Sequence, residues 1–135
     1  MPEKKTLERA RQAKREGKSP STQASEFVHE EIEHIREGKH GARSTKQAIA
    51  IGLSKARRAG VKLKPPRKGQ ASAETRKSAA RDYSKGQTRR TKKPSAKRAR
   101  ASLRRLQREP HKAASHEALA KQARATAAAR KRARS

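Results

Sequence analysis

The sequence of 135 residues contains no cysteine, no tryptophan, one phenylalanine and one tyrosine. Without cysteine, the chain has neither a disulfide framework nor thiolate chemistry. With so few aromatic rings, it lacks the stacking platforms on which proteins that bind single-stranded nucleic acids usually hold bases. No apolar run approaches the roughly 18 residues of a membrane-spanning helix, and the first ten residues, "MPEKKTLERA", lack the apolar region of a secretory signal. We therefore expect no membrane insertion and a cytoplasmic protein.

Acidic residues are also scarce, since 12 Asp and Glu stand against 39 Lys and Arg, and the net charge is +27. Low hydrophobicity with a high net charge is typical of disordered chains, because little apolar burial is available to offset the entropy lost on ordering. A compact chain with this charge requires a polyanionic partner or dense counterions.

The charge is distributed unevenly along the chain. Residues 64–135 hold 24 basic and four acidic residues, whereas residues 21–63 hold eight and five. Most large apolar residues lie within 21–63. We therefore predict four segments. They are a basic N-terminal segment at 1–18, a helical hairpin core at 19–63, a Pro/Gly linker at 64–75 and a cationic tail at 76–135.

The pattern of residues 21–37 predicts an amphipathic helix. Ser19 and Pro20 suit an N-cap and a first helical position, with Ser21 as a competing cap. One face is apolar apart from Glu31. Its apolar members are Ala24, Phe27, Val28, Ile32 and Ile35. The opposite face carries acidic residues, which should point away from phosphate and could hold the cationic tail within the molecule at low salt. These are Glu26, Glu30, Glu33 and Glu37.

A second helix is predicted over 45–59, so that the fold class is all-α and the core is a helical hairpin. Ser44 and Gln47 form the pattern of a capping box. The inner face has a small residue at each of three successive turns, which should allow another helix to approach closely. These residues are Ala48, Gly52 and Ala56.

Two features of the hairpin leave alternatives open. Ile51 falls on the outer side, where either the segment 61–63 or a second molecule could cover it, and a homodimer through the hairpin is one outcome. The order of helix end and Ser-Thr start recurs at 15–24 and 36–48. This recurrence is either ordinary stop and start chemistry or a duplicated unit with a preceding helix at 6–16.

The tail is rich in strong helix formers, and residues 96–109 and 111–132 have high intrinsic helicity. Neither stretch has an apolar face wide enough to dock, and the lysines and arginines along them repel one another. We expect a largely disordered tail or fraying helices in the free protein, with more helix on a polyanion.

Motifs for catalysis, metals and nucleotides are weak in this chain. His29 and His34 are five residues apart and do not stack on one helix face, so they do not match the metal-binding pattern in which the histidines are four apart. The "GKS" at 17–19 would need a glycine at position 12 to complete a phosphate-binding loop, and Gln12 stands there. We therefore expect no enzyme, no cofactor and no metal.

The basic residues carry the functional signal, because lysine and arginine gain sequence-independent affinity by neutralising phosphates and releasing counterions. In the hairpin, the candidates for nucleic-acid binding are Arg43, Lys46, Lys55, Arg57, Arg58 and Lys62. In the tail, they are Arg89, Arg90, Lys92, Lys93, Lys97, Arg98, Arg100, Arg104, Arg105, Arg130, Lys131 and Arg132.

Duplex DNA is the expected partner, bound by a nucleoid-associated protein through its backbone and without base readout. An RNA- or ribosome-associated protein is the alternative, and an anionic membrane surface or an acidic protein is a third class. A helix-turn-helix that reads DNA with residues 45–59 fits less well, because the connector is longer than the usual turn.

Residues 46–60, "KQAIAIGLSKARRAG", with "SPSTQASEFVHEEI" before them and "TRKSAARDYSKGQ" after them, resemble a family of small basic bacterial proteins of unknown function. Members of that family are commonly labelled DNA-binding, which is what the resemblance implies for this chain. The tail is similar, in composition alone, to the Ala/Lys-rich tails of bacterial histone H1-like proteins.

Overall fold

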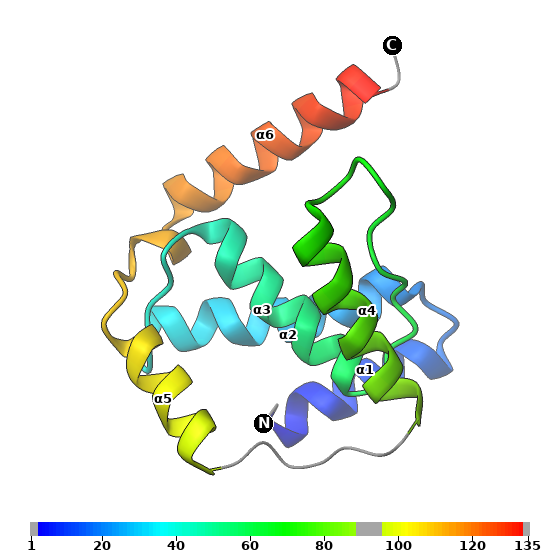
Figure 1. Cartoon of the computed structure of the whole chain (residues 1–135), viewed down its shortest axis with the longest axis horizontal. Coiled ribbons are helices and arrows are strands. Elements are labelled where there is room, and N and C mark those ends of the chain that lie inside the picture. The colour runs from blue at the N-terminus through cyan, green and yellow to red at the C-terminus, as the bar shows by residue number, and fades with distance from the viewer. Residues whose placement is uncertain (1–2, 89–95, 134–135) are drawn as a thin grey trace. The chain divides into compact units, whose positions relative to one another are not determined.

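The computed structural model describes residues 3–88 and 96–133. Within these ranges the protein consists of six α-helices and one short 3-10 helix, with no β-strand (Figure 1). The all-α prediction is confirmed. The helices are α1 (Lys4–Arg15), α2 (Pro20–Arg36), α3 (Thr45–Arg58), α4 (Ala73–Thr88), α5 (Ala96–Gln107), η1 (Lys112–Ala114) and α6 (His116–Ala133).

The chain forms two compact units. Unit 1 consists of the described residues 3–31 and 50–88, and unit 2 consists of 32–49 and 96–133. Unit 1 therefore contains α1, the first part of α2, the last part of α3, and α4. Unit 2 contains the remainder of α2 and α3 with α5, η1 and α6. The four-segment division expected from the charge pattern stays a prediction.

Unit 1 has a core that three helices and the segment after α3 build together. Its buried members are Ala10, Ala24, Phe27, Ala56 and Val61, and Leu7, Leu53 and Leu63 pack against them. The possible preceding helix at 6–16 is present as α1 at Lys4–Arg15, whose buried residues Thr6, Ala10 and Ala13 lie on one face. Burial of the single phenylalanine contributes about 1.5–3 kcal/mol to stability, and the rest of the core is mostly small.

Within unit 1, α2 and α3 pack closely because the stripe of small residues on α3 faces α2. A Cβ atom on Gly52 would lie 2.6 Å from the Val28 Cα and 2.9 Å from the Val28 nitrogen. Ala56 is fully buried one turn later on the same stripe. The predicted close approach of a helix at these positions is confirmed.

The N-termini of both hairpin helices are capped by the expected serines. The Ser19 hydroxyl accepts a hydrogen bond from the Thr22 N–H at 3.2 Å, and the Ser44 hydroxyl accepts one from the Gln47 N–H at 3.1 Å. The Gln47 side chain accepts from the Arg43 N–H at 2.6 Å, one residue earlier than the usual partner of a capping box.

Helix α4 belongs to unit 1 and was not expected from the sequence. It packs on the C-terminal part of α3, where Gly86 lies so close to the Arg57 carbonyl that a side chain at 86 would overlap it. The Gln87 side chain donates to the Gly60 carbonyl at 3.2 Å, and Ala79 is buried. Tertiary contacts, not an apolar pattern, hold this helix in place.

In unit 2, the end of α5 and the segment between α5 and α6 are tied to the end of α2 and to the loop between α2 and α3. The Gly41 N–H donates to the Leu106 carbonyl at 2.7 Å, and the Ala42 N–H donates to the Pro110 carbonyl at 3.0 Å. The Arg36 guanidinium donates to the Ala114 carbonyl at 2.9 Å. Buried apolar side chains accompany these bonds. They include Ile32, Ile35, Ala42, Ala48, Ala113 and Ala114.

The structure of the tail differs from the one that the sequence predicted. The sequence predicted a largely disordered or fraying-helical tail, whereas the described part of 76–135 folds into α4, α5, η1 and α6. Helices α5 and α6 match the two stretches of high helical propensity. The buried alanines of η1 and the backbone bonds at 41–42 supply the anchoring that the sequence pattern did not reveal. None of the described helices combines the length and the apolar character that crossing a membrane requires.

Candidate nucleic-acid interface

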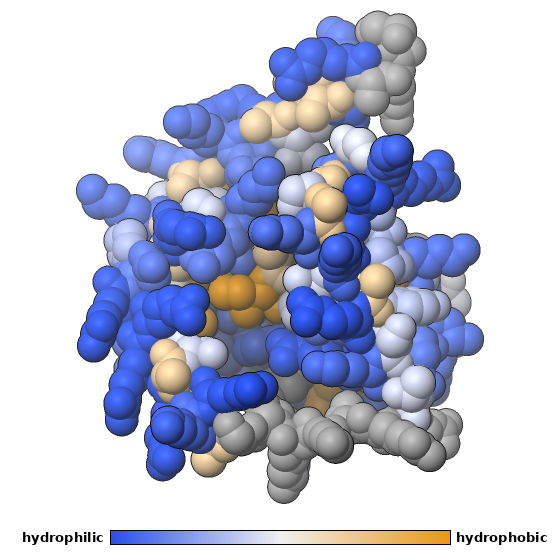
Figure 2. Space-filling model, viewed as in Figure 1, coloured by the Kyte–Doolittle hydropathy of each residue, from blue (hydrophilic) through white to orange (hydrophobic). Residues whose placement is uncertain are grey.

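The folded surface is more cationic than the composition alone indicates. Among the described residues, every lysine and arginine is exposed except Lys55, Arg57 and Arg76. Most acidic residues are buried or half-buried. The acidic residues that stay exposed are Glu8, Glu16, Glu37, Glu74 and Glu117. Figure 2 shows one face of the molecule, on which hydrophilic residues dominate and strongly apolar ones occupy a small central area.

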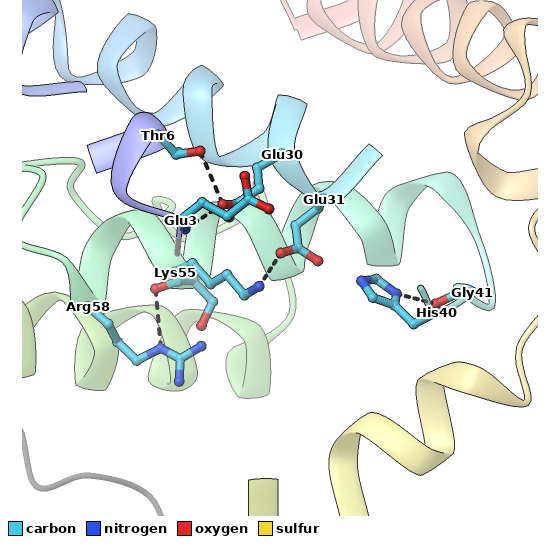
Figure 3. A network of polar contacts seen from close by, with 9 residues as sticks. Glu3, Thr6, Glu30, Glu31, His40, Gly41, Lys55 and Arg58 are labelled. Carbon is cyan, nitrogen blue, oxygen red and sulfur yellow. Dashed lines mark hydrogen bonds and ion pairs between the residues drawn. The ribbon is translucent and has the colours of Figure 1, made fainter. Parts of the chain in front are cut away.

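Glu30 is the first of the acidic residues that the fold removes from solvent. Its Oε1 atom accepts hydrogen bonds from the Glu3 N–H at 2.6 Å and from the Thr6 hydroxyl at 3.1 Å (Figure 3). Glu3 is the N-cap residue of α1 and makes no side-chain cap of its own. The carboxylate of Glu30 therefore caps α1 from a neighbouring helix, where a negative charge also favours the helix dipole. The amphipathic pattern placed Glu30 on the polar face of α2, whereas the structure buries it, because α1 covers that part of the face.

Glu31 and Lys55 form an ion pair between α2 and α3, visible in Figure 3. The Glu31 side chain is 1 % exposed and that of Lys55 is 20 % exposed. Lys55 was expected on the outer side of its helix as a phosphate contact. It instead reaches inward, because the only acidic residue on the apolar face of α2 needs a cation to offset its desolvation.

Asp82 on α4 is a third internal acid. Its Oδ2 atom accepts a hydrogen bond from the Ser54 hydroxyl at 2.6 Å, and its Oδ1 atom lies 3.8 Å from the Arg58 Nε. Arg58 keeps almost half of its side chain exposed. It can therefore contact an external phosphate while it also pairs with Asp82.

Arg57 was also expected to point outward, and the structure buries it. Its Nε donates to the Leu63 carbonyl at 3.1 Å and its Nη2 donates to the Lys64 carbonyl at 3.3 Å. Burial lowers the pKa of Arg57, and the charge of Asp82 partly opposes that effect. Arg57 is therefore a tether between the end of α3 and the segment after it.

This difference predicts opposite roles for two neighbouring arginines. We expect Arg57→Gln to lower the free energy of unfolding by about 1–2 kcal/mol, because two carbonyls lose a charged donor. Arg58→Gln should change stability by no more than about 0.5 kcal/mol, because its ion pair is half-exposed. Urea unfolding followed by circular dichroism measures both values.

The same two variants distinguish an effect on stability from an effect on DNA binding. Arg58→Gln should weaken duplex binding slightly, whereas folded Arg57→Gln should bind as the parent does. Equal stability of the two variants would contradict the assignment of Arg57 as a tether.

The remaining candidates that fall on described residues are exposed. Lys62 follows α3 in unit 1, and Arg43 and Lys46 flank the start of α3 in unit 2. Helix α5 carries Lys97, Arg98, Arg100, Arg104 and Arg105, and the end of α6 carries Arg130, Lys131 and Arg132. Arg89, Arg90, Lys92 and Lys93 lie outside the described residues.

Helix α5 is the most strongly cationic element of unit 2, and no residue of this helix is buried. Ala99, Leu103 and Leu106 recur at helical spacing along one side. Leu103 is 45 % exposed and is the most exposed large apolar residue of the described chain. The basic residues occupy the other side of the helix, where they are exposed to solvent.

Sequence reasoning missed the cations of α1 and α4. On α1, Lys4, Arg11 and Arg15 recur on the side opposite the buried residues. On α4, the exposed cations are Lys77, Arg81 and Lys85. The signal for α1 was present in the spacing of its basic residues. The signal for α4 was absent, because the helix itself was not predicted.

The aromatic residues do not contribute a stacking surface. Phe27 is 1 % exposed in the core of unit 1, and Tyr83 is half-buried on α4. The site therefore consists of exposed cations on helices and short connections, with no aromatic platform for bases among the described residues.

Residues 11–69 match the model of a family of unknown function, DUF6496. The match covers the hairpin and its flanks but not α4, α5 or α6. No curated protein and no solved structure shows significant similarity to the chain. The similarity is thus to an uncharacterised family, and no activity or partner comes with it.

Proposed function

We propose that this protein binds duplex DNA through the phosphate backbone, without base readout, as a nucleoid-associated protein of the cytoplasm. The observation that carries the proposal is the segregation of charge by the fold. Glu30, Glu31 and Asp82 are used for a helix cap, an ion pair and an interhelical hydrogen bond, while nearly all the described cations remain on the surface.

Such a surface gains binding energy from counterion release. Each phosphate that a lysine or arginine neutralises frees condensed cations, so affinity is high at low salt and falls steeply as salt increases. If acidic side chains lay on the surface beside the cations, they would pair with them and leave fewer cations for phosphates. Glu30, Glu31 and Asp82 are removed from the surface. Few carboxylates therefore compete with DNA phosphates for the exposed cations.

The position of the aromatic residues favours a duplex over a single strand. Single-strand binders usually stack bases on exposed rings, and here Phe27 is buried and Tyr83 is half-buried. RNA is the main competing partner, and its phosphates would be neutralised by the same cations. A homodimer through the hairpin stays a prediction, and Phe27 and Ala56 already pack inside unit 1.

We predict that the full-length protein binds random duplex DNA with a log–log salt slope that corresponds to about 6–10 phosphates, and that two unrelated duplex sequences bind equally. Fluorescence anisotropy across a salt series measures the slope. Single-stranded DNA and a structured RNA of equal charge serve as the comparison ligands.

The outcomes of these measurements distinguish the proposed function from its alternatives. Preference for duplex DNA with no sequence dependence supports the proposal. Tighter binding of RNA at every salt concentration would transfer the assignment to an RNA-associated protein, and a shallow slope with strong preference for one duplex would indicate base readout. No binding to any nucleic acid at low salt would overturn the proposal.

A further inference from the structure

We propose that one molecule binds two DNA duplexes at once, one through each compact unit, and so bridges separate DNA segments. This inference rests on the proposed function. It follows from the way the fold divides the exposed charge, which the sequence does not reveal.

The exposed cations are divided almost equally between the two units. Among the described residues, unit 1 exposes fifteen lysines and arginines and unit 2 exposes sixteen. The exposed acids number three in unit 1 and two in unit 2. Along the sequence, residues 64–135 hold most of the net positive charge. Because α1 and α4 belong to the same unit, the fold instead creates two polycationic bodies of similar strength.

In each unit, helices that carry cations are anchored by contacts within that unit. The basic stripe of α1 in unit 1 lies opposite Thr6, Ala10 and Ala13, which are buried. In unit 2, the end of α5 and the segment that follows it are fixed by the hydrogen bonds of Gly41 and Ala42. Each unit therefore presents its charge on ordered elements of its own.

The amount of charge in each unit is sufficient for a separate duplex site. Helix α5 has 12 residues and is about 18 Å long at 1.5 Å per residue. Duplex DNA carries one charge per roughly 1.7 Å, so this length faces on the order of ten phosphate charges. Unit 1 exposes fifteen cations and unit 2 sixteen, so each unit carries enough charge for a contact of about 6–10 phosphates. Neutralisation of one unit leaves the exposed cations of the other available for a second duplex.

The test is capture of a second duplex. A short duplex is immobilised, the full-length protein is bound at a limiting amount, and an unrelated fluorescent duplex is added in low salt. We expect the wild-type protein to retain the fluorescent duplex. A mass measurement of the free protein at the same concentration gives its oligomeric state.

Two charge-neutralised variants with Lys/Arg→Gln substitutions test the role of each unit, since glutamine keeps good helix propensity. The unit 1 variant changes Arg11, Lys14, Arg15, Lys77 and Lys85. The unit 2 variant changes Arg100, Arg104, Arg105, Lys121 and Arg124. A matched control changes five residues from both units, namely Arg11, Arg15, Lys77, Arg104 and Lys121. Circular dichroism checks that each variant retains its helices.

Each single-unit variant should still bind the immobilised duplex, more weakly than wild type, and should capture about tenfold less of the second duplex. The control should retain more capture than either, although it has lost the same charge. Equal loss in all three variants would show that total charge governs capture and would overturn the inference. Full capture by both single-unit variants would do the same, because a self-associated protein would then be the bridge. Binding of the first duplex without capture by wild type would refute bridging alone, whereas no binding of the first duplex would refute the proposed function.

Discussion

Gly52→Ala is expected to lower the free energy of unfolding by about 2–3 kcal/mol, the upper part of the range for overpacking a core. A methyl group at this position would lie 2.6 Å from the Val28 Cα and 2.9 Å from the Val28 nitrogen. These are backbone atoms, so a side-chain rotation cannot relieve the overlap and the two helices must separate.

Helix propensity alone predicts the opposite sign, because alanine is favoured over glycine inside a helix by about 1 kcal/mol. The variant therefore decides between local propensity and tertiary packing. Ala50→Ser, at an exposed position of the same helix, is the control and should change stability by about 0.5 kcal/mol or less. Urea unfolding gives both values. A Gly52→Ala protein more stable than its parent would show that α2 and α3 do not pack in this way.

Lys55→Met is expected to cost about 2–3 kcal/mol. Removing one partner from a fully buried ion pair costs about 3–5 kcal/mol, because the other charge stays buried. The Lys55 side chain is 20 % exposed, and water screening reduces the expected loss. Lys46→Met is the matched control, since Lys46 lies on the same helix and is exposed, and its effect on stability should be about 0.5 kcal/mol or less.

The double variant Glu31→Leu, Lys55→Met tests whether buried charge is the cause. Replacing both members of a buried pair by apolar residues is often neutral, so the double variant should be more stable than Lys55→Met by at least about 1 kcal/mol. If the double variant is instead the less stable of the two, the loss at Lys55 does not arise from an unpaired Glu31 charge.

The Lys55 prediction bears on function because it concerns how the fold keeps its surface cationic. Glu31 is buried together with one cation, Lys55, which pairs with it. Glu30 is buried with a backbone N–H and a hydroxyl group as its hydrogen-bond donors. This arrangement leaves few carboxylates on the surface beside the exposed lysines and arginines, which favours the proposed binding to a phosphate backbone.

The hairpin was largely predictable from the sequence. Its helices begin at the expected caps, Ser19 and Ser44, and the small stripe on α3 meets a neighbouring helix. Periodicity and capping are local properties, so they can be read without knowing the partners. Phe27 and Ile35 were placed correctly in the interior for the same reason.

The sequence predicted that the candidate site consists of lysines and arginines, but it did not identify correctly which of them are exposed. Cations on α5 and α6 were identified from composition, and they are exposed. Lys55 and Arg57 were assigned to the surface and lie inside, because a helical wheel divides a helix into one buried face and one exposed face. Here α2 is covered by α1 as well as by α3, and α3 is also covered by the segment that follows it.

The sequence by itself determined a cationic all-α chain with a capped helical hairpin, because charge balance, helix periodicity and capping depend only on neighbouring residues. The tertiary structure alone decided that Glu30 caps α1, that Lys55 pairs with Glu31, and that α4 packs on α3. It also decided that the exposed charge is shared by two units. These outcomes depend on contacts between segments far apart in the chain, where the desolvation of one charged group is offset by a partner that no local pattern identifies.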